Sequence, residues 1–192
     1  MIALKRASKG VTLVELIMVT AILSVLASVA YPAFADLRQA GAARSARSEL
    51  TVAISQARST AIMQRQNVIA CPTSDHMRCS QDLHWQHGWL VFVDENRNRE
   101  HDDGETLVAS GQALPAGIAV LSTRGRYQIR YQPDGTADGS NMTLTVCDRR
   151  GTSKASSLVM NNSGRLRLGT PSPAQAAAAW VRQKPPAKKY LW

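Results

Sequence analysis

An uninterrupted apolar run near the N-terminus constrains this chain more than any other feature. The run extends from Val11 to Tyr31, a length of 21 residues. As a helix it would be about 32 Å long, enough to cross the hydrocarbon core of a bilayer. A short basic segment precedes it, and basic residues stay on the cytoplasmic side of a membrane. The sequence therefore predicts one membrane-spanning segment, with everything after Tyr31 on the outer side.

The candidate cleavage site distinguishes this segment from an ordinary secretory signal. Such a signal is cut at small residues after its apolar run, whereas the bond that follows Gly10 lies before the run. Glu15 is also unusual, because a carboxylate inside an apolar helix is costly and is usually kept for a function. From the residues alone, Glu15 either has a charged partner in the membrane or reaches toward the lipid headgroups.

The segment KG-VTLVE, residues 9–15, resembles the prepilin signature. In that family a prepilin peptidase cuts after the glycine, here Gly10, and the new N-terminal residue, here Val11, is methylated. Val11 departs from the family's usual Phe. The resemblance implies that Glu15 pairs with the N-terminal amine of a neighbouring pilin subunit, and that Pro32 is the proline at which pilin helices kink or melt during assembly. It also implies a single pass through the inner membrane, a periplasmic C-terminal domain and later incorporation into a pilus.

The remaining pattern predicts an α+β, type IV pilin-like fold, in which a long N-terminal helix packs on antiparallel β-sheets. After a leader (1–10) and a transmembrane half (11–31), we expect an amphipathic half of the helix (32–66) and a β-rich domain (67–169). The apolar positions expected to pack under the sheet are Phe34, Leu37, Leu50, Ile54, Ala57 and Ala61. The predicted strands are 68–71, 89–94, 106–110, 118–122, 127–132, 142–147, 157–160 and 165–168.

Charge is unevenly distributed along the chain. Residues 11–123 carry eight Lys and Arg against eleven Asp and Glu, whereas residues 124–192 carry twelve against three. This asymmetry indicates a polyanionic partner for the C-terminal half, although general solubility would also explain it. Residues 170–192 are rich in Pro and Ala and end in basic residues, which predicts a basic, flexible tail. Trp180, Tyr190 and Trp192 are interleaved with its basic residues and would allow stacking on single-stranded bases.

Residues 10–169 resemble the FimT/FimU minor pilins and the related type II secretion pseudopilin H, on the segments CPTSD, GWLVFVDENRN, GSNMTLTVCDRRG and NNSGRLRLG. The FimT-type members bind DNA during natural transformation, and a GRxR motif near the end of their domain is implicated. That motif corresponds here to residues 164–167. In an extended strand Arg165 and Arg167 would share one face, with Leu166 and Leu168 toward the core. The candidate DNA contacts are therefore Arg165 and Arg167, with Arg149, Arg150 and Lys154 as neighbours.

The cysteines indicate one local disulfide. Cys71 and Cys79 are eight residues apart in a turn-rich segment, and in a domain outside the cytoplasm they would form a disulfide. Cys147 lies in an alternating strand pattern and is expected to be a buried thiol.

Two segments contain residue types that are common in metal sites, but for each of them another explanation is favoured. The first, HWQH at residues 84–87 with Cys79 nearby, lacks a fourth ligand, and a polar loop explains it. The second has the oxygen-bearing side chains of a calcium loop: Asp94, Asn96, Asn98, Asp102, Asp103 and Glu105. There Arg99 replaces the turn glycine and basic side chains weaken the field, so an acidic hairpin is favoured. We expect no metal and no cofactor.

The sequence contains no activated nucleophile, carboxylate dyad or phosphate-binding glycine loop, so we expect no enzymatic activity. It predicts a minor type IV pilin that binds DNA non-specifically during DNA uptake. Its expected partners are DNA, other pilin subunits, the prepilin peptidase and, before assembly, the inner membrane. The alternatives are a structural pilin that primes or caps a type IV pilus and a type II secretion pseudopilin.

Overall fold

The computed structural model describes residues 10–137, 139 and 141–183, so the leader before Gly10 lies outside the described residues. The chain divides into two compact units between Arg38 and Gln39, and helix α1 (Leu13–Gln64) begins in the first and ends in the second. The N-terminal part of α1 is long and apolar enough to cross a membrane, and its side chains are exposed.

Three hydroxyl side chains in the membrane-type segment of α1 find their hydrogen-bond partners within the helix. The hydroxyls of Thr20, Ser24 and Ser28 each donate a hydrogen bond to a carbonyl oxygen three or four residues earlier in the helix. Such bonds remove the cost of unpaired hydroxyls in hydrocarbon. Helix α1 continues through Pro32. The change expected at Pro32 during assembly therefore stays a prediction.

The C-terminal part of α1 packs on the sheets through a stripe of small and branched residues. Leu50, Ile54, Ala57 and Ala61 are buried, as predicted. Phe34 and Leu37 were expected in the same stripe, and this was wrong: their side chains are 64% and 66% exposed. The stripe begins later because both residues precede the unit that contains the sheets, which starts at Gln39.

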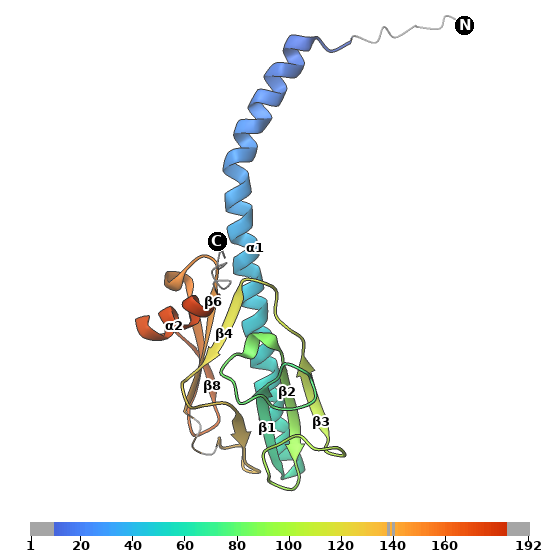
Figure 1. Ribbon diagram of the computed structural model, residues 1–192, viewed down its shortest axis with the longest axis vertical. Coiled ribbons are helices and arrows are strands. Elements are labelled where there is room, and N and C mark those ends of the chain that lie inside the picture. Colours follow the sequence, from blue (N-terminus) through green and yellow to red (C-terminus); the bar gives the residue numbers. More distant parts are fainter. Residues whose placement is uncertain (1–9, 138, 140, 184–192) are drawn as a thin grey trace, which may run out of the picture. The chain divides into compact units, whose positions relative to one another are not determined.

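Within the described residues, eight strands form two antiparallel four-stranded sheets after the long helix, so the predicted fold class is confirmed (Figure 1). The first sheet has the order β3-β2-β1-β5 and the second the order β4-β6-β7-β8. The strands of the first sheet are β1 (Asn67–Pro72), β2 (Trp89–Asp94), β3 (Leu107–Gly111) and β5 (Ile129–Tyr131). Those of the second are β4 (Ile118–Ser122), β6 (Met142–Asp148), β7 (Ser156–Met160) and β8 (Leu166–Gly169).

The main core lies between α1 and the inner faces of both sheets. Val91 of the first sheet and Leu144 of the second join Leu50 of α1 in this cluster. A second, smaller cluster covers the opposite face of the first sheet and contains Ile69, Cys71, Leu90 and Phe92, with Cys79 packed against it. Strands β1 and β2 are therefore buried on both faces, which explains their continuous apolar sequences.

Residues 170–192 were predicted to form a flexible tail, and this was wrong for the first part of the segment. It contains helix α2 (Pro173–Gln183), which packs on β4 and β6. Ala176 and Ala179 are buried there, and the thiol of Cys147 donates a hydrogen bond to the carbonyl oxygen of Ala176 at 3.6 Å. Burial raises the pKa of Cys147 to about 11, so the thiol stays protonated. The alanine run had been assigned to the flexible tail. Its small side chains instead allow α2 to approach the sheet closely. Residues 184–192 lie outside the described residues.

Candidate nucleic-acid interface

A tight turn between β7 and β8 positions the predicted GRLR segment. Gly164 has a φ of +73°, and a Cβ atom added there would lie 2.3 Å from the carbonyl oxygen of Gly135. Only glycine fits a backbone with this conformation and this close contact. Gly164 N donates to the carbonyl oxygen of Asn161 at 2.9 Å, which closes the turn. The first residue of the segment therefore has a structural role, namely to direct the chain into Arg165.

Side chains from two distant parts of the chain hold this turn. The hydroxyl of Tyr131, at the end of β5, donates a hydrogen bond to the carbonyl oxygen of Gly164 at 3.1 Å. Arg58 of α1 donates to the carbonyl oxygens of Gly135 at 2.9 Å and of Ser163 at 3.4 Å. Tyr131 is fully buried, and burial raises its pKa to about 12, so it remains a donor. Tyr131 and Arg58 could not be predicted from the sequence, because nothing local associates either residue with residues 161–164.

Arg165 and Arg167 are both exposed at the start of β8, the edge strand of the second sheet. Arg165 immediately precedes the strand, and Arg167 is paired with Val159 of β7. Leu166 packs against the main core as expected. Leu168 does not: its side chain is 65% exposed, because β8 is an edge strand. Two exposed guanidinium groups thus follow a turn whose last residue, Gly164, is buried, at positions whose backbone spacing is about 6.6 Å.

The three other predicted contacts lie at the opposite end of β7. Arg149, Arg150 and Lys154 are in the connection from β6 to β7, whereas Arg165 follows the turn at the far end of β7. The register of β7 with β8 separates the two groups by about 13–20 Å. Arg150 also donates a bidentate pair of hydrogen bonds, from Nε to Oδ1 and from Nη2 to Oδ2 of Asp148, which is buried. The five basic residues therefore form two groups rather than one patch, and in the second group Arg149 and Lys154 are exposed.

Comparison with known proteins identifies the family. Residues 46–164 match the family of Type II transport protein GspH, and residues 5–31 match the prokaryotic N-terminal methylation motif. The chain belongs to the GspH family. The GspH match ends at Gly164, immediately before the two exposed arginines.

Individual known proteins are similar to this chain in sequence or in fold. This GspH-family chain is similar to the pilin-like protein PilA1 of Thermus thermophilus, with 32% identity over 168 residues, which cover 83% of this chain and 97% of PilA1. Its fold is similar to that of the type IV minor pilin FimU of Pseudomonas aeruginosa, with a TM-score of 0.53, 18% identity, and coverage of 69% of this chain and 88% of FimU. A second crystal form of FimU gives a TM-score of 0.50, 17% identity, and coverage of 66% and 91%.

The predicted disulfide between Cys71 and Cys79 is present in this GspH-family domain. It closes a loop at the end of β1, in which the carboxylate of Asp75 accepts hydrogen bonds from the backbone N–H groups of Arg78 and Met77 and from the hydroxyl of Thr73. These bonds, that from Arg78 first, lower the pKa of Asp75 to about 2. The disulfide is consistent with a domain outside the reducing cytoplasm.

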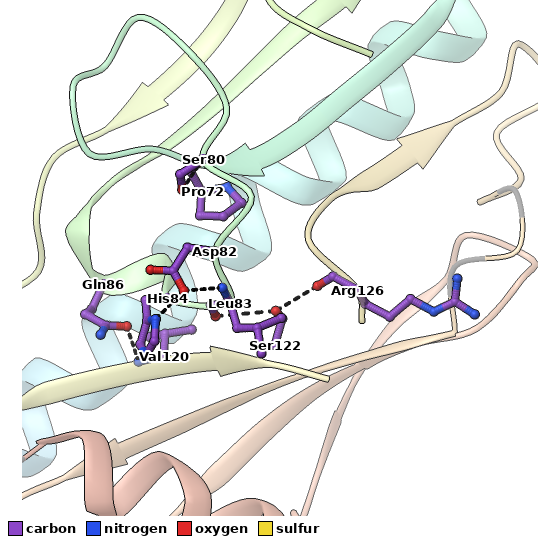
Figure 2. Close-up of polar contacts among 9 residues, drawn as sticks. All are labelled: Pro72, Ser80, Asp82, Leu83, His84, Gln86, Val120, Ser122 and Arg126. Carbon is purple, nitrogen blue, oxygen red and sulfur yellow. Dashed lines mark hydrogen bonds and ion pairs between the residues drawn. The ribbon is translucent and has the colours of Figure 1, made fainter. Parts of the chain in front are cut away.

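The histidine segment joins the two sheets instead of gathering ligands. Ser122 N at the end of β4 donates to the carbonyl oxygen of Leu83, and Val120 N donates to the side chain of Gln86 (Figure 2). His84 contacts Asp82 at 2.5 Å. Burial alone would raise the pKa of Asp82, but hydrogen bonds from His84 and Leu83 outweigh it and lower the pKa. Trp85 is buried in the main core. The segment therefore has a structural explanation within the GspH-type fold.

The residues predicted for processing and assembly lie at the start of the described chain. Gly10, Val11 and Glu15 are exposed, and Glu15 is in the first turn of α1, where its N–H donates to the hydroxyl of Thr12 at 3.3 Å. Of the predicted tail residues, Trp180 is half-buried in α2, whereas Tyr190 and Trp192 lie outside the described residues.

Proposed function

We propose that this minor pilin binds DNA without sequence preference, through Arg165 and Arg167, during DNA uptake in natural transformation. The observation that carries the proposal is the exposed position of both guanidinium groups directly after a turn that is fixed by buried contacts. Arginine forms strong, charge-assisted hydrogen bonds to phosphate oxygens. A fixed backbone reduces the conformational entropy lost when these contacts form.

The overall charge supports the same partner. Residues 124–192 carry a net charge of +9, and this segment includes both arginines. A basic region attracts nucleic acid over a long range and independently of base sequence. Arg149 and Lys154 form a second exposed group at the other end of β7, which a longer DNA could contact at the same time. Arg150 contributes less, because its guanidinium is already bonded to Asp148.

The test measures DNA binding of the full chain in non-ionic detergent. In fluorescence anisotropy, the wild type should bind two unrelated duplexes with similar affinities. The double variant Arg165→Gln/Arg167→Gln should bind both duplexes much more weakly than the wild type does. Gln keeps the strand pattern and removes the charge. The matched control is Arg44→Gln/Arg47→Gln, with the same charge change on α1, about 16–21 Å along the helix from Arg58. Equal binding by wild type and the Arg165/Arg167 variant would refute the assignment of these residues.

Processing and orientation belong to the same proposal. Cleavage after Gly10 and methylation of Val11 would leave a mature protein anchored by α1, with its disulfide-containing domain in the periplasm until the subunit joins a pilus. Mass spectrometry of the membrane fraction should find a methylated N-terminal peptide that begins at Val11. An intact leader in cells with active prepilin peptidase would contradict the proposal.

A second candidate is a secretion pseudopilin or structural pilin that does not bind DNA. The match to the Type II transport family favours it, because that match does not include Arg165 or Arg167. If the wild-type chain binds no DNA even at low salt, this second function replaces the first.

A further inference from the structure

A buried carboxylate that its surroundings only partly satisfy stands at the start of the loop between β2 and β3. Asp94, the last residue of β2, is 1% exposed. Its Oδ1 accepts a hydrogen bond from Arg99 N at 3.3 Å, so the carboxylate faces the loop that follows. Its Oδ2 is buried and has no hydrogen-bond partner among the described residues. Burial of a charged oxygen without a partner is costly, so this oxygen is a candidate ligand for a cation.

The spacing of oxygen-bearing side chains in this loop is that of a twelve-residue calcium loop. Such a loop binds the ion through side chains at positions 1, 3, 5, 9 and 12 and a main-chain carbonyl at position 7. Counted from Asp94, these positions are filled by Asp94, Asn96, Asn98, Asp102 and Glu105, with the carbonyl of Glu100. Asp103, the remaining carboxylate of this segment, is at position 10 and has no ligand role.

Arg99 stands at position 6, where a calcium loop usually has glycine, but its backbone has the conformation that the loop requires. That glycine is needed for its left-handed backbone, and Arg99 adopts this conformation, with a φ of +68°. Arg97 does the same at position 4, with a φ of +64°. Both side chains are exposed, so water and salt screen their charges from the loop interior. The backbone therefore has the required turn without glycine.

Three of the ligand positions already converge on one point. The side-chain amides of Asn96 and Asn98 both contact Asp102 Oδ2, at 2.8 and 2.6 Å. Each asparagine Oδ1 accepts one backbone N–H, from Asn98 and Glu100 respectively, and keeps a second lone pair. A cation placed between these side chains would replace the two amide donors as the partner of Asp102.

Glu105 lies where the loop ends meet. Its carboxylate accepts hydrogen bonds from Glu95 N at 3.0 Å and from Asp102 N at 3.2 Å. Among the described residues, no three His, Cys, Asp or Glu side chains are placed to hold a metal by themselves. The site therefore also requires the asparagine and main-chain oxygens, and Asp102 and Glu105 must turn inward as the ion binds.

The β2–β3 loop packs on the smaller hydrophobic cluster. The ring of His101 packs on Phe92 with a centroid distance of 5.1 Å, and His101 Nδ1 contacts the carbonyl oxygen of Met77 at 2.8 Å. Met77 lies in the loop that the Cys71–Cys79 disulfide closes. A cation in the β2–β3 loop would therefore stabilise two adjoining loops on the outer face of the first sheet.

We propose that residues 94–105 form a calcium site, in contrast to the prediction from sequence that the chain holds no metal. The ion accounts for the unpartnered Asp94 Oδ2 and for the convergence of Asn96, Asn98 and Asp102. Three carboxylates and neutral oxygens suit Ca²⁺, whereas Mg²⁺ demands a stricter octahedral geometry. With three charged ligands and exposed arginines beside them, the expected Kd is in the extracellular range, about 10⁻⁴–10⁻³ M.

Calorimetry and thermal melting of the full chain in non-ionic detergent test this proposal. Calcium chloride should bind in a 1:1 ratio and raise Tm, because the ion binds only the folded state, whereas magnesium chloride at equal ionic strength should change Tm much less. Glu105→Gln should weaken calcium binding by about tenfold or more, because it removes one of three charged ligands. Arg99→Gly should strengthen binding, since glycine suits its φ and the change removes a positive charge.

The matched control is Asp103→Asn, which removes one carboxylate of the same loop at a position without a ligand role. Its calcium affinity should stay within about twofold of the wild type. The proposal is overturned if the wild type shows neither heat nor a rise in Tm at about 10 mM calcium, ten times the upper end of the expected Kd range. It is also overturned if Asp103→Asn loses as much affinity as Glu105→Gln. Neither result bears on DNA binding, which is measured separately.

Discussion

The hydroxyl of Tyr131 donates a hydrogen bond to the carbonyl oxygen of Gly164 across 3.1 Å. This bond joins β5 of the first sheet to the turn that precedes β8 of the second. The sulfur of Met160 lies 3.3 Å from the same hydroxyl, but a carbonyl oxygen is the stronger acceptor for its single proton. The two sheets are therefore connected at the point where the chain turns toward Arg165.

Replacing Tyr131 by Phe should lower the free energy of unfolding by about 1–3 kcal/mol, because the buried carbonyl of Gly164 loses its donor while the ring volume is kept. Chemical denaturation of the wild type and variant measures this difference. Tyr127→Phe is the control, since Tyr127 is exposed, and it should change the free energy little. Equal stability of the Tyr131 variant and the wild type would contradict the role of the bond.

Asp75 should make the stability of the domain depend on pH in the acid range. The folded chain holds the pKa of Asp75 at about 2, below its ordinary value of 3.8. Its carboxylate therefore stabilises the fold above pH 3.8, and this contribution is lost as the pH falls toward 2. Melting curves should show Asp75→Asn with a lower Tm than the wild type at neutral pH, and the gap should close between pH 4 and pH 2. A gap that does not change with pH would count against this account.

The disulfide should stabilise the domain by restricting the unfolded chain. A cross-link between residues eight apart, as Cys71 and Cys79 are, corresponds to about 2.5 kcal/mol. The variant Cys71→Ser/Cys79→Ser should lose roughly this free energy of unfolding in chemical denaturation. A reducing agent should lower the Tm of the wild type and leave that of the variant unchanged. If the reductant changes the Tm of both proteins equally, the disulfide is not the source of the difference in stability.

Glu15 should be required for assembly rather than for membrane insertion. A carboxylate in the membrane segment needs a positive partner, and the prepilin resemblance supplies one in a neighbouring subunit's N-terminal amine. Glu15→Ala should accumulate in the membrane but be depleted from sheared fibres, as measured by immunoblotting. Ser24→Ala, a change in the same segment that removes no charge, should assemble normally. Normal incorporation of Glu15→Ala into fibres would exclude the pairing.

The fold could be predicted from sequence because its signals are local. The alternation of apolar segments and turn residues located the eight strands found among the described residues, and close spacing identified Cys71 and Cys79 as partners. The errors came from properties that depend on the whole fold. Leu168 alternates like a core residue, but it lies on an edge strand. The alanines of α2 have no helix-breaking residue among them, but their packing on β4 and β6 is a tertiary contact that the local sequence does not reveal.

The candidate site was predictable only in part, for the same reason. The motif identified Arg165 and Arg167, and both are exposed. The grouping with Arg149 and Lys154 failed because those residues, although near in sequence to β7, lie at its other end. In the β2–β3 loop, Arg99 in place of glycine counted against the left-handed backbone that a calcium loop needs, because a left-handed residue other than glycine is uncommon. The structure nevertheless has a left-handed backbone at Arg99.

The salt dependence of DNA binding tests the central claim most directly. Each phosphate contact releases counterions, so the logarithm of the binding constant falls linearly with the logarithm of salt concentration. For duplex DNA, Arg165→Gln/Arg167→Gln should flatten this slope by about 2 relative to the wild type, while Arg44→Gln/Arg47→Gln should leave it unchanged. Identical slopes for the wild type and the Arg165/Arg167 variant would show that these two arginines do not contact phosphate.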